Sequence, residues 1–588
     1  MTRTMTGAEM VIKALADQGV KHVFGYPGGA VLPIYDELVQ QDKVEHILVR
    51  HEQGAVHAAE GYARSTGKVG VVLVTSGPGA TNAVTGLTDA LLDSIPIVCL
   101  TGQVPTHLIG NDAFQECDTV GITRPCTKHN WLVRRIEDLP RVLHEAFYVA
   151  RSGRPGPVVV DIPKDIQFAS GEYVGPNPAG HKTYKPQVKG DLNAIRQAVD
   201  MLASARKPLF YTGGGVINSG TNASRLLREL VQLSGFPITS TLMGLGAYPS
   251  ADPQWLGMLG MHGTYEANWA MHDCDVMLNV GARFDDRITG RLDAFAPNSR
   301  KIHIDIDPSS INKNVKVDLA IVGDVAHVLE DMVRIWRTKN PAIDKKALKD
   351  WWTAIDRWRA RDCLKYKPNK SVIMPQFAVE RLYALTKDKD TFITTEVGQH
   401  QMWAAQFYRF EEPNRWMTSG GLGTMGYGLP AAVGVQVAHP DSLVIDIAGD
   451  ASVLMTMQEM STAAQHKLPI KIFILNNQYM GMVRQWQQLL HGNRLSHSYM
   501  ESLPDFVKLA EAYGCHGIRA ERPDELDDKI MEMMAVKKPV LFDCRVAALA
   551  NCFPMIPSGK AHNDMLLGED LPDEEIGNAI GKEGKVLV

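Results

Sequence analysis

The chain has 588 residues, of which 45% are hydrophobic and 22% are charged, and its formal net charge is −5. This composition is typical of a folded protein with a large core, and the length predicts several domains. The 61 basic and 66 acidic residues are well mixed, so no basic tract indicates nucleic-acid binding. No stretch approaches the roughly 18 uncharged apolar residues of a membrane helix.

The N-terminal residues and the cysteines indicate in which cellular compartment the protein is expected. The first ten residues, MTRTMTGAEM, lack the apolar core of a secretory signal. The eight cysteines form no CxxC pair, and their spacing suits no zinc site. Reduced thiols are therefore expected, and with them a cytoplasmic protein.

Short apolar strands alternate with helical stretches three times along the chain. The predicted strands are 22–27, 45–51, 69–75, 95–101 and 157–162, then 208–212, 276–280, 301–307 and 319–322, then 391–396, 443–447, 470–475 and 539–543. Continuous apolar strands joined through helices indicate parallel sheets that are covered on both faces. The predicted fold class is α/β, with three doubly wound domains and mainly parallel sheets.

Changes in composition predict the domain boundaries. Residues 169–190 are rich in Gly, Pro and Lys, and residues 338–372 carry many charges around a predicted helix at Trp351-Trp352. The chain turns polar beyond Pro554, and from Gly568 it resembles a loose acidic tail. We expect domains at 1–180, 190–345 and 370–560, followed by a tail at 561–588.

Two predicted strands of the last third end in polar residues. Gly449-Asp450 follows one strand, and Asn477 follows the next strand, 27 residues after Asp450. Ligands bind at the carboxyl ends of parallel strands, and a helix predicted from Ala451-Ser452 through Met460 would offer N-terminal amides to a phosphate. Carboxylate and amide oxygens suit Mg²⁺ with diphosphate. Taken separately, each dipeptide could simply be a turn.

The spacing of the two dipeptides resembles the thiamine diphosphate signature, GDG followed after about 25 residues by NN. Ala451 replaces the usual second Gly, which adds a methyl group but removes no ligand. By this resemblance, Asp450, Asn477 and the backbone carbonyl of Tyr479 hold the metal.

Thiamine chemistry also requires a carboxylate beside the aminopyrimidine ring, where it shares a proton and so activates the cofactor. Glu52, in the stretch RHEQGA, follows a predicted strand of the first domain and precedes a helix. An acid at that position could also serve only to balance the helix dipole. With Asp450 and Asn477 in place, activation is the favoured role of Glu52.

Ten further stretches, in order, are similar to the catalytic large subunit of acetohydroxyacid synthase, also called acetolactate synthase. They are FGYPGGA, RHEQGA, TSGPGATN, AFQE, PKD, LGMH, RFDDR, VGQH, GTMG and MGMVRQW. The resemblance covers nearly the whole chain. It implies that pyruvate is decarboxylated on thiamine diphosphate and that its hydroxyethyl group condenses with a second 2-keto acid. The products are 2-acetolactate or 2-aceto-2-hydroxybutyrate, in the first common step of valine, leucine and isoleucine biosynthesis.

The resemblance implies a role for each domain and for particular residues. The first domain binds the pyrimidine ring, and the last binds diphosphate and Mg²⁺. The implied active-site residues of the first domain are Gly29, Phe114, Gln115 and Lys164, besides Glu52. The implied thiamine contacts are Gln399, His400, Gly423, Met425, Gly449, Asp450, Ala451, Ser452, Asn477 and Met482. By the same resemblance, Trp486 forms an apolar wall for the second 2-keto acid, which is the acceptor, and Arg287 binds the carboxylate of that acid.

The middle domain is expected to bind FAD in a Rossmann-like fold. TGGGV, which begins at Thr212, follows a strand as a phosphate-binding turn would, although it is not a full GxGxxG. Asp305, near the end of a predicted strand, is placed to accept a ribose hydroxyl. By resemblance, the flavin site comprises Arg154, Gly213, Thr241, Leu242, Met261, His262, Arg283, Asp305 and Asp324. A structural flavin is favoured because the net reaction transfers no electrons.

Other readings of the sequence remain. The nearest is a thiamine- and FAD-dependent pyruvate oxidase, and a glyoxylate carboligase is disfavoured because that family replaces the activating Glu. A simple decarboxylase and a non-catalytic nucleotide-binding protein are further alternatives. The resemblance also implies a homodimer or tetramer, in which Glu52 and the metal site meet across an interface, and a regulatory small subunit.

Overall fold

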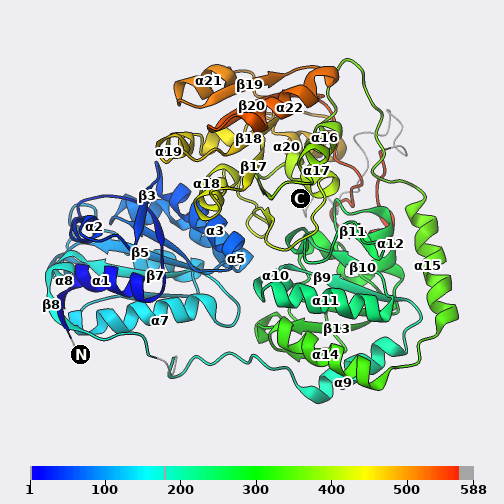
Figure 1. Cartoon of the computed structure of the whole chain (residues 1–588). Coiled ribbons are helices and arrows are strands. Elements are labelled where there is room, and N and C mark those ends of the chain that lie inside the picture. The colour runs from blue at the N-terminus through cyan, green and yellow to red at the C-terminus, as the bar shows by residue number, and fades with distance from the viewer. Residues whose placement is uncertain (1–2, 178–180, 569–588) are drawn as a thin grey trace.

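The computed structural model describes residues 3–177 and 181–568. The acidic tail predicted from Gly568 lies almost wholly outside the described residues. Figure 1 shows three α/β bodies, with the N-terminal domain in blue and cyan, the middle domain in green, and the C-terminal domain in yellow to orange. Each contains one six-stranded parallel sheet, so the predicted fold class is confirmed.

The N-terminal sheet has the strand order β3-β2-β4-β5-β7-β6. Its strands are β2 (His22–Tyr26), β3 (Glu45–Leu48), β4 (Gly70–Val74), β5 (Ile97–Gln103), β6 (His129–Leu132) and β7 (Val158–Pro163). Helices α3 (Glu52–Thr66) and α5 (Val84–Asp93) pack on one face, and α1 (Gly7–Asp17), α2 (Leu32–Val39) and α7 (Leu139–Arg151) on the other. Short helices α4 (Pro78–Asn82), α6 (Thr119–Thr123) and α8 (Lys164–Phe168) lie in the connections. Strands β1 (Arg3–Thr6) and β8 (Ser170–Tyr173) form a separate antiparallel pair.

The middle sheet has the order β11-β10-β9-β12-β13-β14. Its strands are β9 (Pro208–Thr212), β10 (Ile238–Ser240), β11 (Trp255–Met258), β12 (Val276–Val280), β13 (Arg300–Asp305) and β14 (Leu319–Val322). Its helices are α9 (Leu192–Ala203), α10 (Gly214–Asn218), α11 (Thr221–Ser234), α12 (Tyr265–Asp273), α13 (Asp286–Thr289) and α14 (Val325–Lys339). The predicted helix at Trp351-Trp352 is α15 (Lys345–Arg359), and it buries Trp351 against this domain.

The C-terminal sheet has the order β16-β15-β17-β18-β20-β19. Its strands are β15 (Thr391–Thr395), β16 (Trp416–Met417), β17 (Leu443–Gly449), β18 (Lys471–Asn476), β19 (His516–Ala520) and β20 (Val540–Arg545). Its helices are α16 (Pro375–Thr386), α17 (Gln399–Phe407), α18 (Gly428–Ala438), α19 (Glu459–Gln465), α20 (Gly481–Leu490), α21 (Phe506–Ala512) and α22 (Leu526–Ala535). After β20, residues 552–567 return to the middle domain, where the buried His562 contacts the carbonyl oxygen of Ile288.

Every predicted strand is present, with ends that differ by up to three residues. The strand predicted at 45–51 ends at Leu48, because His51 caps α3 and its Nδ1 accepts a hydrogen bond from the Gln53 amide (3.1 Å). Seven strands were not predicted from the sequence: β1, β6, β8, β10, β11, β16 and β19. Most of these are short or lie at a sheet edge, where polar residues obscure the apolar pattern.

The predicted helix from Ala451 through Met460 is wrong. The structure has a single 3₁₀ turn at Val453–Met455, and α19 begins only at Glu459. Ser452 Oγ bonds to the backbone of Gly449, and Thr456 Oγ1 donates to the carbonyl oxygen of Gly426. Such side-chain bonds to the backbone compete with helix formation.

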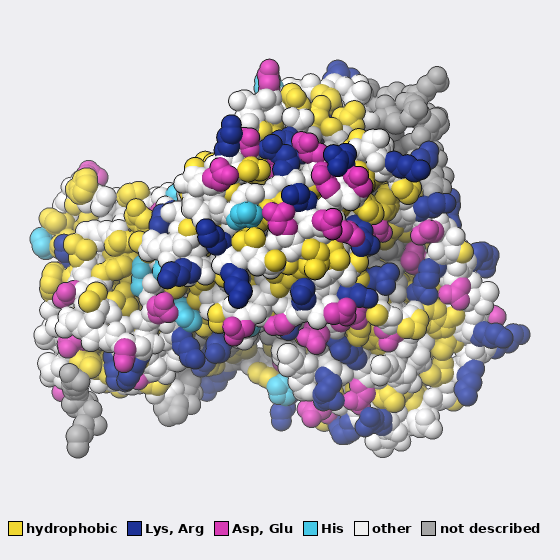
Figure 2. Space-filling view, turned by 45° about the horizontal axis from the view of Figure 1, so that its top comes forward, with side chains coloured by type: hydrophobic (Ala, Val, Ile, Leu, Met, Phe, Trp, Pro, Cys, Tyr) yellow, Lys and Arg dark blue, Asp and Glu magenta, His cyan; other side chains and the backbone are white. Residues whose placement is uncertain are grey.

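Other sequence expectations can be compared with the folded chain. All eight cysteines are free thiols. Within the described residues, no helix is both long enough and apolar enough to cross a membrane. On the face shown in Figure 2, basic and acidic side chains are interspersed, in keeping with the mixed charges of the sequence.

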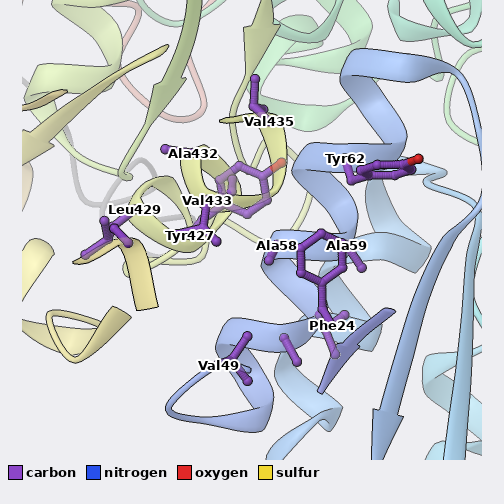
Figure 3. Packing of buried hydrophobic residues seen from close by; sticks show 14 of the residues in the cluster. Phe24, Val49, Ala58, Ala59, Tyr62, Tyr427, Leu429, Ala432, Val433 and Val435 are labelled. Atoms are coloured by element: carbon purple, nitrogen blue, oxygen red, sulfur yellow. The ribbon is translucent and has the colours of Figure 1, made fainter. Parts of the chain in front are cut away.

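Helices α3 and α18 join the N-terminal and C-terminal domains through one shared apolar core. Figure 3 shows Ala58 on the side of α3 that faces α18, whereas Ala59 and Tyr62 lie on the opposite side of that helix. The two backbones touch: a Cβ on Gly434 would lie 1.8 Å from the carbonyl oxygen of Ala58, and one on Gly61 would lie 2.1 Å from that of Ala431. Glycine is therefore required at both positions.

Substitution Gly434→Ala is expected to lower the free energy of unfolding by at least about 2 kcal/mol, because the added methyl group separates two packed helices. Thermal and urea unfolding measure the change. Gly175→Ala serves as the control, since a Cβ there meets no atom within 4 Å. Equal stabilities of the two variants would contradict the close approach of α3 and α18.

Candidate active site

Asp450 and Asn477 meet at the carboxyl edge of the C-terminal sheet. Strands β17 and β18 are neighbours, with Gly449 opposite Leu475, so the residues that follow them lie side by side. The backbone amides of Asn477 and Gln478 approach the Asp450 carboxyl group. Asp450 is 1% exposed, and within the described chain its Oδ2 has no hydrogen-bond partner. Such a buried, unpaired oxygen is suited to bind a cation.

Tyr479, whose backbone carbonyl is the third predicted metal ligand, lies beside this pair. Its backbone amide donates to Oδ1 of Asn477 (3.1 Å), and Nδ2 of Asn477 donates to Oε1 of Gln399 (3.2 Å). Asp450 is itself affected by its surroundings: burial raises the pKa of its carboxyl group to about 7. A bound cation would reverse this effect, because it favours the ionised form.

Gln399 and His400 begin α17 next to the same edge. A Cβ on Gly449 would lie 2.7 Å from the His400 ring, so glycine is needed there. Burial lowers the pKa of His400 to about 3, which keeps the imidazole neutral. Among the described residues, nothing bonds to its buried Nε2. Ala451 is partly exposed and Ser452 is buried, directly after Asp450.

One large cavity, of about 1100 Å³, lies between the middle and C-terminal domains and is lined on a further side by residues of the N-terminal domain. All nine predicted flavin residues line it: Arg154, Gly213, Thr241, Leu242, Met261, His262, Arg283, Asp305 and Asp324. Gly423, Met425, Met482, Arg287 and Trp486 line it as well. The structure thus brings together around one cavity the residues predicted to bind the flavin and those predicted to bind the second 2-keto acid. Some of the residues predicted to contact thiamine diphosphate line the same cavity.

The cavity wall contains polar groups without partners. Thr241 Oγ1 and His262 Nε2 are buried, and no described residue hydrogen-bonds to either atom. The turn after β9 is tight, since a Cβ on Gly213 would lie 2.6 Å from the carbonyl oxygen of Gly281. Arg154 enters from the N-terminal domain and pairs with Asp307 (3.5 Å). A long polar ligand with hydrogen-bonding groups fits such a wall.

Arg287 and Trp486 approach each other at the cavity. The guanidinium of Arg287 lies 6.0 Å from the Trp486 ring centroid, within the range of a cation–π contact. Arg287 also lies 3.6 Å from Asp286 Oδ2. The pair offers a positive group beside an apolar wall, which suits an acceptor that carries both a carboxylate and an alkyl chain.

Helix α20 carries Met482 and Trp486. The residues that hold this helix in place, Arg484 and Gln485, were not predicted from the sequence. Arg484 is buried and donates to Gln488 Oε1 (2.7 Å), Asn551 Oδ1 (2.6 Å) and the Ala550 carbonyl oxygen (2.6 Å). Gln485 Oε1 accepts hydrogen bonds from the Gln399 side chain and the Cys552 amide. The only sequence signal was the stretch MGMVRQW, which contains both Arg484 and Gln485.

The predicted N-terminal residues gather at the carboxyl edge of their own sheet. Gly29 follows β2, Glu52 follows β3, Phe114 and Gln115 follow β5, and Lys164 follows β7. Glu52 is buried, and Asn82 Nδ2 donates to its Oε2 (2.9 Å), a partner missed in the sequence although it lies in TSGPGATN. Phe114 is 88% exposed.

None of the five described residues Gly29, Glu52, Phe114, Gln115 and Lys164 lines the cavity that contains Met425 and Met482. A single chain therefore presents two separate groups of candidate site residues. One group surrounds Glu52, and the other comprises the sheet edge with Asp450 and Asn477 together with the residues that line the cavity.

Comparisons with known proteins agree with this geometry. Three models of thiamine pyrophosphate enzymes match the chain: the N-terminal TPP-binding domain at residues 5–122, the central domain at 195–332, and the C-terminal TPP-binding domain at 396–544. The acetolactate synthase isozyme 3 large subunit of Escherichia coli is 52% identical over 96% of this chain and 99% of its own length.

The chain belongs to the acetolactate synthase large-subunit family. The large subunit of Haemophilus influenzae is 50% identical over 97% of this chain and all of its own length. An acetolactate synthase of Mycobacterium bovis is 48% identical over 95% of this chain and 91% of its own. The resemblance found in the ten sequence stretches is confirmed, and thiamine diphosphate is the cofactor that the family models name.

Proposed function

We propose that this protein is an acetolactate synthase. It decarboxylates pyruvate on thiamine diphosphate and joins the two-carbon product to pyruvate or 2-ketobutyrate, giving 2-acetolactate or 2-aceto-2-hydroxybutyrate. The proposal rests on similarity to acetolactate synthase large subunits over nearly the whole chain. It makes the protein the enzyme of the first common step in valine, leucine and isoleucine biosynthesis, in the cytoplasm.

Asp450, Asn477 and the backbone carbonyl of Tyr479 would hold Mg²⁺, with the cofactor diphosphate as a further ligand. The unpartnered Oδ2 of Asp450 supports this assignment, because a buried carboxylate oxygen normally has a partner. Three residues beside Asp450 would contact the diphosphate: Gly449, Ala451 and Ser452. Met425 would contact the rest of the cofactor, together with four further residues: Gln399, His400, Gly423 and Met482.

Bound thiamine diphosphate supplies a nucleophilic carbon that adds to a 2-keto acid and accepts the negative charge left when CO₂ departs. Glu52 would share a proton with the ring nitrogen of the aminopyrimidine that lies farthest from that carbon. Asn82 orients the Glu52 carboxylate through one hydrogen bond (2.9 Å). The Met425 side chain would pack against the cofactor and support it.

Arg287 and Trp486 would bind the second 2-keto acid, through its carboxylate and its alkyl chain respectively. Their proximity at the cavity supports a common role. Gly29, Phe114, Gln115 and Lys164 would complete the active site from the other group of residues. An apolar wall discriminates a single methyl group by about 10–200-fold, which suits a choice between pyruvate and 2-ketobutyrate.

FAD would occupy the large cavity, against the nine lining residues named above. The unpartnered Thr241 Oγ1 and His262 Nε2 support a polar ligand there. Because acetolactate formation is redox-neutral, we assign the flavin a structural role. A pyruvate oxidase would use both cofactors as well, but the near full-length relatives are acetolactate synthases.

The minimal active unit would be a homodimer, in which Glu52 of one chain completes the site on the C-terminal domain of its partner. The separation of Glu52 from the Met425 cavity within one chain supports this arrangement. A tetramer would be a pair of such dimers. A regulatory small subunit is expected, because relatives are named large subunits.

Product analysis tests the function. Purified protein with Mg²⁺, thiamine diphosphate and FAD is supplied with pyruvate and 2-ketobutyrate in competition. Acetolactate is detected as acetoin after acid decarboxylation, and 2-aceto-2-hydroxybutyrate by its own decarboxylation product. Oxygen consumption with acetyl phosphate and peroxide as products would instead identify a pyruvate oxidase.

Substitution Glu52→Gln is expected to lower turnover at least about 100-fold, because a neutral amide cannot share the proton. Cofactor affinity, from a titration with thiamine diphosphate at saturating Mg²⁺, should stay within roughly an order of magnitude, since the diphosphate contacts carry the binding. Glu45→Gln, at the exposed start of β3, is the control. Near-normal turnover of the Glu52 variant would remove this residue from the mechanism.

Substitution Trp486→Leu is expected to lower the preference for 2-ketobutyrate over pyruvate by about 10-fold or more, because the apolar wall recedes from the extra methyl group. The ratio of the two products in the competition assay measures the preference. Trp358→Leu, on α15, should leave the ratio unchanged. An unaltered ratio in the Trp486 variant would exclude this side chain as the specificity wall.

A further inference from the structure

Helix α19 of the C-terminal domain holds the backbone that leads into Glu52. Both carboxylate oxygens of Glu459 accept a hydrogen bond from the Arg50 amide (3.1 and 3.2 Å), and the His51 amide also faces them. Glu459 is 1% exposed, and Thr462 Oγ1 donates to its Oε2 (2.7 Å). The Glu459 carboxylate is thus held by Thr462 of its own helix and by the Arg50 and His51 amides of the N-terminal domain.

Three further hydrogen bonds connect α19 and the residue after it to the same segment. Arg50 Nε donates to Ser461 Oγ (3.1 Å), and Arg50 Nη2 donates to Gln465 Oε1 (2.6 Å). The Leu48 amide donates to Nε2 of His466 (3.2 Å). Arg50 and the last residue of β3 are therefore bonded to α19 and to the residue that follows it.

The Glu459 side chain also packs closely against Gly54 in the first turn of α3. A Cβ on Gly54 would lie 2.5 Å from Glu459 Oε1, so a larger residue there would displace the carboxylate. An anion at the N-terminal end of a helix is favoured by the helix dipole. Glu459 therefore binds the start of α3 through hydrogen bonds, packing and charge together.

We propose that Glu459 is a positioning residue for Glu52, the first residue of α3. The inference rests on the proposed role of Glu52. Asn82 provides the single side-chain hydrogen bond to the Glu52 carboxylate among the described residues. The remaining precision must come from the backbone, and a displacement of about 1 Å can lower a rate about 100-fold.

A double-mutant cycle tests this role. Glu459→Gln replaces one of the two acceptor oxygens by an NH₂ group, which opposes the donor amides of Arg50 and His51. In the otherwise wild-type protein, turnover should fall about 10-fold or more, with affinity for thiamine diphosphate changed less than about threefold. In the Glu52→Gln protein, the same substitution should cause no further loss, because its effect passes through Glu52.

Two other variants make the result decisive. Glu511→Gln removes an exposed acid from α21 of the same domain and should leave turnover unchanged. Thr462→Val removes one bond to Glu459 but keeps its carboxylate. It should lower turnover about two- to fivefold, again only when Glu52 is present, and it serves if Glu459→Gln does not fold.

The proposal is overturned if Glu459→Gln, or Thr462→Val where the former does not fold, retains full turnover. It is also overturned if the substitution lowers turnover by the same factor in both backgrounds, which would indicate a merely structural role. Normal turnover of Glu52→Gln alone would instead refute the proposed role of Glu52, so the two failures are distinguishable.

Discussion

The contact between α3 and α18 is the constraint on which the candidate site depends. The two helices approach until backbone meets backbone at Gly61 and Gly434, and they enclose one apolar core that belongs to both domains. Glu52 is the first residue of α3. At the other helix, the buried Glu396 carboxylate accepts hydrogen bonds from the Gly426 and Leu429 amides, which orders the turn that follows Met425. The same packing therefore positions parts of both candidate groups.

The sheet edge with Asp450 and Asn477, and the cavity, contain several buried polar atoms without partners among the described residues. Asp450 Oδ2, His400 Nε2, Thr241 Oγ1 and His262 Nε2 are of this kind among the described residues. An unsatisfied buried polar group destabilises a fold by about 1–3 kcal/mol. These four atoms belong to residues that the sequence motifs single out, and the proposed metal, diphosphate and flavin would provide their missing contacts.

The two groups of candidate residues differ in their surroundings. The cavity residues line a space between the domains, whereas the N-terminal edge exposes large apolar side chains: Leu32 (54%), Phe114 (88%) and Phe168 (65%). Exposed apolar residues next to polar candidate residues form a surface that the partner chain of the proposed homodimer would cover. This contrast is the physical basis for the proposed homodimer.

Local patterns in the sequence determined the repeated strands, the alternation with helices and therefore the parallel α/β class. They also placed Asp450 and Asn477 at neighbouring strand ends, since strand order and spacing bring such residues to one edge. The family resemblance supplied the nine flavin residues, and the cavity they share could not be derived from the residues alone.

Contacts between residues far apart in the sequence were decided only by the tertiary structure. Glu459 binds the Arg50 amide across 409 positions, and Arg484 binds residues 66 and 67 positions away. Neither contact leaves a periodic signal, because the first depends on how two domains pack and the second on how distant segments of one domain pack, and not on the local pattern. The helix predicted after Ser452 failed for a related reason, since Thr456 bonds to Gly426, thirty positions earlier, and the backbone there follows that contact instead of its own helical bonds.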